Sequence, residues 1–242
     1  MKKIVSFCNR NKIILIYDEI YTGWCKTGTT FYFQRYKNIY PDILTTSKSL
    51  GGGKASIAAC VMRKKIFNKV YGSINDATLH STTFNGFGEE CVTAIEAIKI
   101  LKKEKFNQKA KMIEKHINKK FNKLNENHPS FNMKLKGAGG IQKIYFDLSK
   151  KSYELSIKKD FKKKYKNLFL WRKRLFEIAL IDTLYLKFNI FAFHSLNSLV
   201  ISPSLIVQKK QIDYIFFSLE RIFQLEPESI IKNYLKRKNK KN

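Results

Sequence analysis

Short apolar runs alternate with amphipathic segments along the first half of this chain. Residues 12–17, KIILIY, form a run rich in β-branched residues that ends directly in Asp18 and Glu19. This pattern predicts a fully buried strand that places two carboxylates at its C-terminal end. Short apolar runs predict two further strands, at residues 42–46 and 57–63.

Helical spacing of apolar residues characterises much of the segment that follows. Residues 64–71 predict a short helix, and residues 73–87 predict a polar loop rich in hydroxyl groups. From Gly88 to Leu124, small and apolar residues recur with helical periodicity. This periodicity predicts one or two long helices, with a break near Phe106.

The pattern changes after Pro129. Residues 136–148 predict a glycine turn followed by a strand, and residues 152–180 predict a basic helix. Two more strands and an amphipathic closing helix are expected at residues 184–193, 197–207 and 209–225. Strands that alternate with helices indicate the α/β class.

Two domains are expected within this α/β chain. The first spans residues 1–128 and includes the long helices, and the second is a smaller α/β domain at residues 129–242 that ends in a basic tail. The boundary is expected near residues 125–135, where the pattern changes. The sequence contains no internal repeat.

Composition narrows the class of protein. Of the 242 residues, 44% are hydrophobic and 14% aromatic, which excludes a disordered chain and suffices for a real core. The formal net charge of +28 includes 40 lysines spread along the sequence, densest at residues 158–174 and in the tail. No RNA-binding aromatic motif or basic heptad accompanies them. We therefore expect a solvated basic surface without specific nucleic-acid binding, and phosphate-backbone binding is the alternative.

The cysteines and the N-terminus predict a soluble cytoplasmic protein. The four cysteines are isolated, without a CxxC pair or a zinc-ligand spacing, so neither a disulfide framework nor a metal site is expected. The first residues break their apolar run with Asn and Arg, which does not resemble a secretory signal. No run approaches the roughly 18 apolar residues that span a bilayer, so no membrane association is expected.

Three features together predict a site for pyridoxal 5'-phosphate. Asp18 and Lys48 each follow a predicted strand, and a hydroxyl-rich loop lies further along the chain. This cofactor needs a lysine for its aldehyde, an acid facing its ring nitrogen and donors for its phosphate. Such groups collect at the carboxyl ends of strands in open α/β sheets. The glycines at 51–53 would let the chain turn sharply beside a flat ring.

The sequence resembles the class III pyridoxal-phosphate aminotransferases of fold type I. The resemblance is carried by DEIYTGWCKTG, PDILTTSKSLGGG and HSTTFNGF. The family patterns are DE-x-x-TG-x-x-R-TG, then PDI, [ST]K-[GS]-LGGG and H-x-[ST]-T-[FY]. The match is continuous over residues 11–101 and weaker over residues 135–225. It implies part of a large domain with a mostly parallel sheet and flanking helices, followed by a small α/β domain.

The resemblance also implies a role for each matching residue. Asp18 would pair with the pyridinium nitrogen, and Lys48 would hold the aldehyde as a Schiff base and then act as the acid and base. Ile20 would pack against the ring, and Tyr21 stands where the family often has Gln near the ring hydroxyl. Thr83 would reach the phosphate of a neighbouring subunit's cofactor, which implies a homodimer. Glu19 is expected to orient its surroundings.

The expected activity is amino-group transfer from an amine or amino-acid donor to a keto or aldehyde acceptor. Aminomutases, decarboxylases and epimerases of the family share the same motifs. Many members also carry an Arg for a substrate carboxylate at the position of Val200. A nucleotide-binding P-loop is the alternative for the Asp18 strand, but GGGKAS lacks the required GxxxxGK[ST] pattern.

Family members carry a long stretch before the strand that ends in Asp-Glu, and this stretch includes the phosphate-binding turn. We therefore expect the chain to be the C-terminal portion of such an enzyme, incomplete on its own and complemented by an N-terminal half. A decayed or repurposed fragment without catalysis is the alternative. Strands at the centre of the family's sheet would then have exposed edges.

Overall fold

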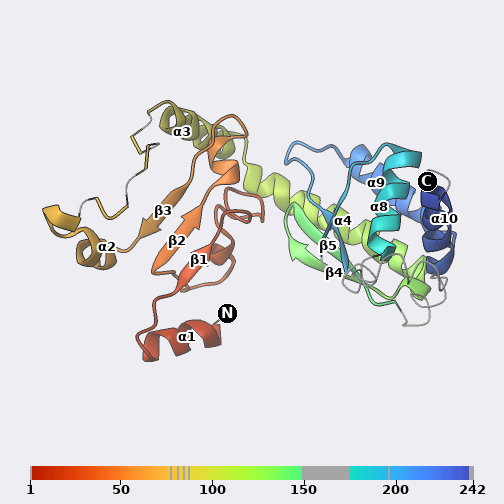
Figure 1. Cartoon of the computed structure of the whole chain (residues 1–242), viewed down its shortest axis with the longest axis horizontal. Helices are drawn as coiled ribbons and strands as arrows, with labels where there is room; N and C mark the ends of the chain where they lie inside the picture. Colours follow the sequence, from red (N-terminus) through yellow and green to blue (C-terminus); the bar gives the residue numbers. More distant parts are fainter. Residues whose placement is uncertain are drawn as a thin grey trace. The chain divides into compact units, whose positions relative to one another are not determined.

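The computed structural model divides the chain into two compact units, Met1–Lys111 (unit 1) and Met112–Asn242 (unit 2). It describes residues 2–76, 78–80, 82–83, 85–86, 88–148, 175–195 and 197–239. Figure 1 shows the helices and strands of both units, each of which is considered by itself.

Unit 1 contains a three-stranded sheet with the order β1-β2-β3 (Figure 1). Its strands are β1 (Ile16–Asp18), β2 (Ile43–Thr46) and β3 (Ala59–Met62). β1 pairs with β2 in parallel, whereas β2 pairs with β3 in antiparallel fashion. The expectation of a mostly parallel large sheet is therefore wrong for the described residues. The connection from β2 to β3 contains no crossover helix, which a parallel return normally requires.

The helices of unit 1 follow the sequence pattern except at the N-terminus. They are α1 (Lys2–Arg10), α2 (Lys64–Tyr71), α3 (Gly88–Lys103) and the start of α4 (Phe106–Asn127). The predicted break near Phe106 is confirmed, because Lys105 has a left-handed φ of 51° between α3 and α4. Helix α1 was not expected. Short 3-10 turns complete the unit, namely η1 (Tyr32–Arg35), η2 (Lys48–Gly51) and η3 (Ile74–Asp76).

Unit 2 is built on a four-stranded antiparallel sheet with the order β4-β5-β7-β6. The strands are β4 (Met133–Ala138), β5 (Ile141–Phe146), β6 (Phe193–Ser195) and β7 (Ser198–Ile201). The helices are the remainder of α4, α8 (Leu175–Phe188), α9 (Lys209–Phe223) and α10 (Pro227–Asn239), and η4 (Pro129–Phe131) precedes β4. The sequence pattern predicted β5, β7 and α9, but it missed β4 and α10.

One expected strand of unit 2 is wrong. Residues 184–193 complete helix α8 and lead into β6. Seven residues of α8 are buried, among them Phe176, Leu180 and Leu184. A helix buried on most sides has no polar face, and its apolar run cannot be distinguished from a buried strand by periodicity. Most of the expected basic helix at 152–180 lies outside the described residues.

The hydrophobic core of the described chain lies in unit 2. Its buried cluster runs from Ile113 to Leu235 and joins α4, α8, α9, α10 and the sheet. Aromatic rings form its centre, where Phe131 and Phe223 stack with centroids 4.0 Å apart. Unit 1 buries far fewer apolar side chains, namely Cys8, Cys25, Ile39, Leu44, Leu50, Ala94 and Ala110. Unit 2 can therefore stabilise itself by apolar burial to a much greater extent than unit 1.

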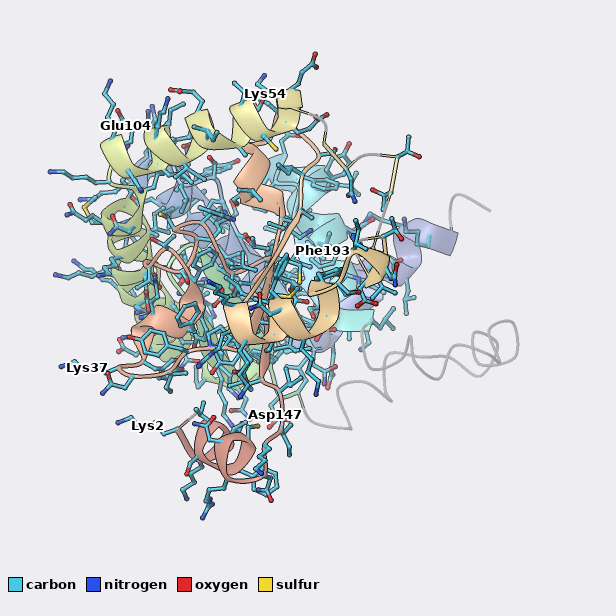
Figure 2. All side chains as sticks on the ribbon, turned by 90° about the vertical axis from the view of Figure 1, so that its left-hand side faces the viewer. Lys2, Lys37, Lys54, Glu104, Asp147 and Phe193 are labelled. Atoms are coloured by element: carbon cyan, nitrogen blue, oxygen red, sulfur yellow. The ribbon has the colours of Figure 1, made fainter. Side chains whose placement is uncertain are left out.

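Most of the charge lies at the surface of the described chain. Figure 2 shows the side chains of Lys2 and Lys37 extending away from the ribbon. None of the described helices combines the length and the hydrophobicity that a membrane-spanning segment requires.

Asp213 on α9 contacts His116 and Lys120 of α4 and makes the stability of unit 2 depend on pH. Its Oδ1 lies 2.9 Å from His116 Nε2 and 2.6 Å from Lys120 Nζ. The hydrogen bond from Lys120 is the main reason that the pKa of Asp213 falls below its ordinary value of 3.8. A carboxyl whose pKa is lowered by folding stabilises the fold above its ordinary pKa, and this stabilisation is lost as the pH falls through the lowered value.

We predict that Asp213→Asn lowers the melting temperature by a few degrees at most near neutral pH. The difference from the unchanged protein should shrink as the pH falls below 3.8 and disappear once the pH is below the lowered pKa of Asp213, where both proteins lack the charge. Thermal unfolding followed by circular dichroism across this pH range measures the effect. Asp147→Asn, at an exposed residue after β5, is the matched control. A deficit of Asp213→Asn that persists at the acid end would contradict the assignment.

Candidate active site

The parallel pairing of β1 with β2 brings the two predicted catalytic residues to one end of the sheet. The register pairs Ile16 with Ile43 and Asp18 with Thr45. The Glu19 N–H donates to the Thr45 carbonyl at 2.9 Å, so the pairing continues past Asp18. Lys48 follows Thr45 by three residues. Because parallel strands end at the same edge, Asp18 and Lys48 lie at the carboxyl ends of neighbouring strands.

Asp18 keeps its carboxylate at the strand end and accessible to solvent. Its side chain is exposed, and its Oδ1 accepts a hydrogen bond of 3.0 Å from the backbone N–H of Ile20. This local bond between an Asp and the backbone two residues on is typical of an Asx turn. Asp18 is thus oriented by its own backbone, with acceptor capacity left for a ligand.

Glu19 is the buried anchor of the loop between β1 and η1. Its side chain is 3% exposed and accepts hydrogen bonds from the backbone N–H groups of Tyr32 and Phe33, both at 2.9 Å. The Thr22 hydroxyl donates to the same carboxylate. Three donors compensate for the removal of the charge from water. The expected orienting role of Glu19 is thereby given a physical basis.

Trp24 connects this loop to the strand that leads into Lys48. Its Nε1–H donates to the Thr46 hydroxyl at 2.7 Å, and Thr46 is almost fully buried. Gly23 allows the close approach, because a Cβ there would lie 2.8 Å from the Glu19 carbonyl oxygen. The sequence motif did not reveal this link, since the partners are 22 residues apart.

The backbone of Lys48 is left-handed, with a φ of 46°. Among the described lysines, Lys12 and Lys105 share this feature, but both follow helices, where left-handed residues are common. Lys48 instead leaves a strand and opens the 3-10 turn η2. A non-glycine residue in this region costs on the order of 1–3 kcal/mol and is characteristic of functional sites.

The glycines after Lys48 form the sharp turn that the sequence predicts. Gly52 and Gly53 have left-handed φ values of 60° and 76°, which glycine adopts without strain. A Cβ at Gly52 would lie 3.0 Å from the Cβ of Ala97 on α3, so the turn lies against this helix. Figure 2 marks Lys54 at the end of the turn, beside α3. Ser47 fixes the other side through a hydrogen bond of 2.8 Å to the Ile57 carbonyl.

Tyr21 lies beside Lys48. The Lys48 Nζ is 6.0 Å from the centroid of the Tyr21 ring, at the outer limit of a cation–π contact. Both side chains are exposed, and Ile20 between Asp18 and Tyr21 is half-buried. The structure therefore places Asp18, Ile20, Tyr21 and Lys48 in one region of unit 1.

Thr83 is exposed in the loop before α3. Among the described contacts, none connects Thr83 with Asp18 or Lys48, so its phosphate-binding role stays a prediction. Val200 lies in β7 of unit 2, opposite Lys143 of β5. The Val200 position therefore has a strand neighbour that carries a positive charge.

Burial changes the ionisation of groups around the loop. Burial lowers the pKa of the Lys26 ammonium, and it raises the pKa of the Cys25 thiol despite an opposing hydrogen bond to the Asn107 backbone. Burial is also the main cause of the raised pKa of the Tyr17 hydroxyl, and the Cys8 thiol adds to it. These groups lie within the supporting structure, whereas Asp18 and Lys48 face solvent.

The residues at this edge fit part of a pyridoxal phosphate molecule. An exposed carboxylate can hold a proton on a ring nitrogen, and an exposed primary amine can bind an aldehyde. The Tyr21 hydroxyl can donate to an oxygen on the ring. These side chains therefore fit the ring and the aldehyde of the cofactor. The phosphate would need other donors, namely Thr83 and groups outside this edge of the sheet.

One family of known proteins matches most of this chain. The family described as aminotransferase class-III matches residues 1–223. The chain belongs to this family. The resemblance inferred from the motifs is thereby confirmed for most of the chain.

Individual relatives show how much of the family fold is present. The chain is 32% identical over 145 residues to an adenosylmethionine-8-amino-7-oxononanoate aminotransferase of Buchnera aphidicola subsp. Baizongia pistaciae, covering 60% of this chain and 34% of the relative. A Bacillus anthracis aminotransferase structure superposes with a TM-score of 0.75 at 18% identity, covering 93% of this chain and 47% of that chain.

A second solved structure gives the same result. The S-selective transaminase from an Arthrobacter species with alanine bound superposes with a TM-score of 0.75 at 20% identity. The match covers 96% of this chain and 47% of the transaminase. The chain thus has part of the aminotransferase fold and spans about half the length of the solved structures.

The buried carboxylate of Glu19 generates a prediction about the loop. In Glu19→Gln, the amide NH2 group would face backbone donors, and the mismatch should weaken the loop by about 1–3 kcal/mol. We expect the amides of Tyr32 and Phe33 to exchange hydrogen at least about fivefold faster. Site-resolved hydrogen exchange measures this change.

Glu96→Gln on α3 is the matched control, because the exposed Glu96 carboxylate contacts Lys99 at the surface. It should leave the exchange of Tyr32 and Phe33 unchanged. Equal exchange rates in both variants would show that Glu19 does not anchor the loop.

Proposed function

We propose that this chain is the part of a pyridoxal-phosphate-dependent class III aminotransferase that carries the catalytic lysine. It would act together with the remaining polypeptide of such an enzyme. The observation that carries the proposal is the left-handed Lys48 just after β2, at the same sheet edge at which the parallel neighbour β1 ends in Asp18. The family match supports the chemistry, and the partial coverage of the relatives supports the need for further polypeptide.

Each residue would have a defined role in this enzyme. When bound, pyridoxal phosphate supplies a protonated ring that can accept an electron pair from a substrate. Asp18 would hold the proton on the ring nitrogen. Lys48 would bind the aldehyde carbon and later move a proton at the substrate α-carbon. Ile20 would contact the ring, and Tyr21 would donate to its hydroxyl oxygen.

The proposed reaction moves an amino group from an amine or amino-acid donor to a keto or aldehyde acceptor. The name of the Buchnera relative identifies adenosylmethionine and 8-amino-7-oxononanoate as the first substrates to test. At the position of Val200, an apolar side chain cannot make the bidentate contact of an Arg with a carboxylate. A substrate carboxylate would therefore be held by other residues.

The proposed assembly is a homodimer of the complemented enzyme. Thr83 would then reach the phosphate of the neighbouring subunit's cofactor. The exposed position of Thr83 is compatible with a contact outside its own subunit. The four cysteines are free thiols, which fits the reducing cytoplasm that we propose as the location.

Chemical trapping at Lys48 tests the proposal. The chain is mixed with pyridoxal phosphate and with the part of the Buchnera relative that precedes the matched region. Borohydride then reduces the carbon–nitrogen double bond between lysine and the aldehyde carbon to a stable single bond. We expect peptide mass spectrometry to find the label mainly on Lys48. Lys48→Arg should lower the total incorporation about tenfold or more, because guanidinium does not form this bond.

Lys54→Arg is the matched control, because Lys54 is an exposed lysine at the end of the same turn. It should leave labelling at Lys48 unchanged. Incorporation spread evenly over the surface lysines, or unchanged in Lys48→Arg, would instead support a fragment without catalysis.

A further inference from the structure

Three helices of unit 2 line a cavity of about 440 Å³. Helix α8 packs against both α9 and α10 (Figure 1). The lining residues of one helix are spaced three or four positions apart, so they lie on one helical face. Examples are Thr183 and Lys187 of α8, and Ile230, Asn233 and Arg237 of α10. A cavity of this size can hold a small molecule.

Three cations line this cavity, hereafter the basic cavity, and each comes from the last turn of a different helix. They are Lys187, Arg221 and Arg237. Among the described residues, no carboxylate lines the basic cavity. The helix dipole stabilises a cation in the last turn, so each position by itself is ordinary. The dipoles do not account for three like charges around one cavity, where these charges repel one another.

Arg237 is held in place, yet one of its donors has no acceptor. Its Nη2 donates to Asp182 Oδ2 at 2.8 Å and to the Thr183 hydroxyl at 3.2 Å. The Thr183 hydroxyl donates in turn to the Ala179 carbonyl at 2.7 Å. The Arg237 Nε is buried and has no hydrogen-bond partner within the described part of the chain. A buried donor without an acceptor is unfavourable, and an anionic ligand would supply the acceptor.

The positive charge of the basic cavity is only partly neutralised. Lys187 and Arg221 form no ion pair with any residue that the structure describes. Asp182, the partner of Arg237, also contacts Lys238 at 3.3 Å between Oδ1 and Nζ. Its single negative charge is therefore shared between two cations. A ligand with two negative charges would match the remaining positive charge.

A second cavity of unit 2 has the opposite charge. Glu220 and Glu226 line this cavity of about 510 Å³, and within the described residues neither a lysine nor an arginine does so. His128 lies in the same cavity and contacts Glu220 at 3.0 Å. The net charge of +28 therefore does not give every cavity a positive lining. The three cations of the basic cavity are a local feature.

The remaining wall of the basic cavity is largely apolar. Ile222 and Ile230 line it and are 3% and 2% exposed, as members of the hydrophobic core. Phe188 is half-buried and packs against the same core. The exposed amide of Asn233 can donate or accept a hydrogen bond. A ligand that combines an anionic group with an apolar body would therefore contact both kinds of surface.

We propose that the basic cavity binds a phosphomonoester with an apolar body. A phosphate group carries about two negative charges near neutral pH and has three acceptor oxygens. The guanidinium groups of Arg221 and Arg237 suit these oxygens, and Lys187 adds a point charge. A carboxylate has one charge and two oxygens, which match three cations less well. This site goes beyond the proposed function, because the candidate active site lies in unit 1.

Calorimetric titration of the full chain with phenyl phosphate tests the proposal. The salt concentration is about 0.15 M, which screens the solvated lysines elsewhere on the surface. We expect one phenyl phosphate to bind per chain. Inorganic phosphate lacks the apolar body and benzoate lacks the phosphate group, so each should bind at least about tenfold more weakly.

Removal of one cation from the basic cavity should weaken binding. We expect Lys187→Met and Arg221→Met each to lower the affinity for phenyl phosphate about fivefold or more. Lys210→Met is the matched control, because Lys210 is an exposed lysine of α9 that does not line the cavity. It should leave the affinity unchanged. All three positions are exposed, and equal melting temperatures of the free chains would show that folding is preserved.

Each remaining result has a defined meaning. The proposal is overturned if phenyl phosphate shows no saturable binding, or if Lys210→Met loses as much affinity as Lys187→Met. Equal affinity for inorganic phosphate would contradict the apolar contact, and equal affinity for benzoate would contradict the phosphate group. Lys48→Arg should bind phenyl phosphate as the unchanged chain does. A loss of binding in Lys48→Arg would place the ligand in unit 1 and refute the assignment to the basic cavity.

Discussion

The parallel pairing of β1 with β2 is the contact on which the candidate site depends. It joins segments 27 positions apart in the sequence, as the pairing of Ile16 with Ile43 shows. A shift of the register by one residue would turn every side chain of one strand to the other face. The observed register places Asp18 beside Thr45 and thereby brings the carboxylate and Lys48 to the same edge.

A buried polar support holds this exposed chemistry in place. Glu19 removes a carboxylate from water and compensates with donors from Thr22, Tyr32 and Phe33. Trp24 then connects the loop to β2 just before Lys48. Glu19, Trp24 and Thr46 form the buried contacts, so Asp18 and Lys48 remain accessible to solvent. This separation suits a site that must receive a ligand and yet keep a fixed geometry.

The two units differ in how much of their apolar surface is buried. Unit 2 buries a continuous aromatic and aliphatic cluster around Phe131 and Phe223. Unit 1 carries the chemistry but exposes apolar residues along β1. The chain therefore combines a unit with a continuous apolar core and a unit whose sheet exposes apolar side chains along β1.

The sequence alone determined the local features of this protein. The run before Asp18, the glycines after Lys48 and the periodicity through α2 and α3 predicted strands, turn and helices, because these depend on short-range preferences. The sequence did not predict three features that depend on distant residues. They are the antiparallel direction of β3, the Trp24–Thr46 hydrogen bond and the helical conformation of residues 184–188. Only the tertiary structure could decide these features, since burial and strand direction are properties of the assembled chain.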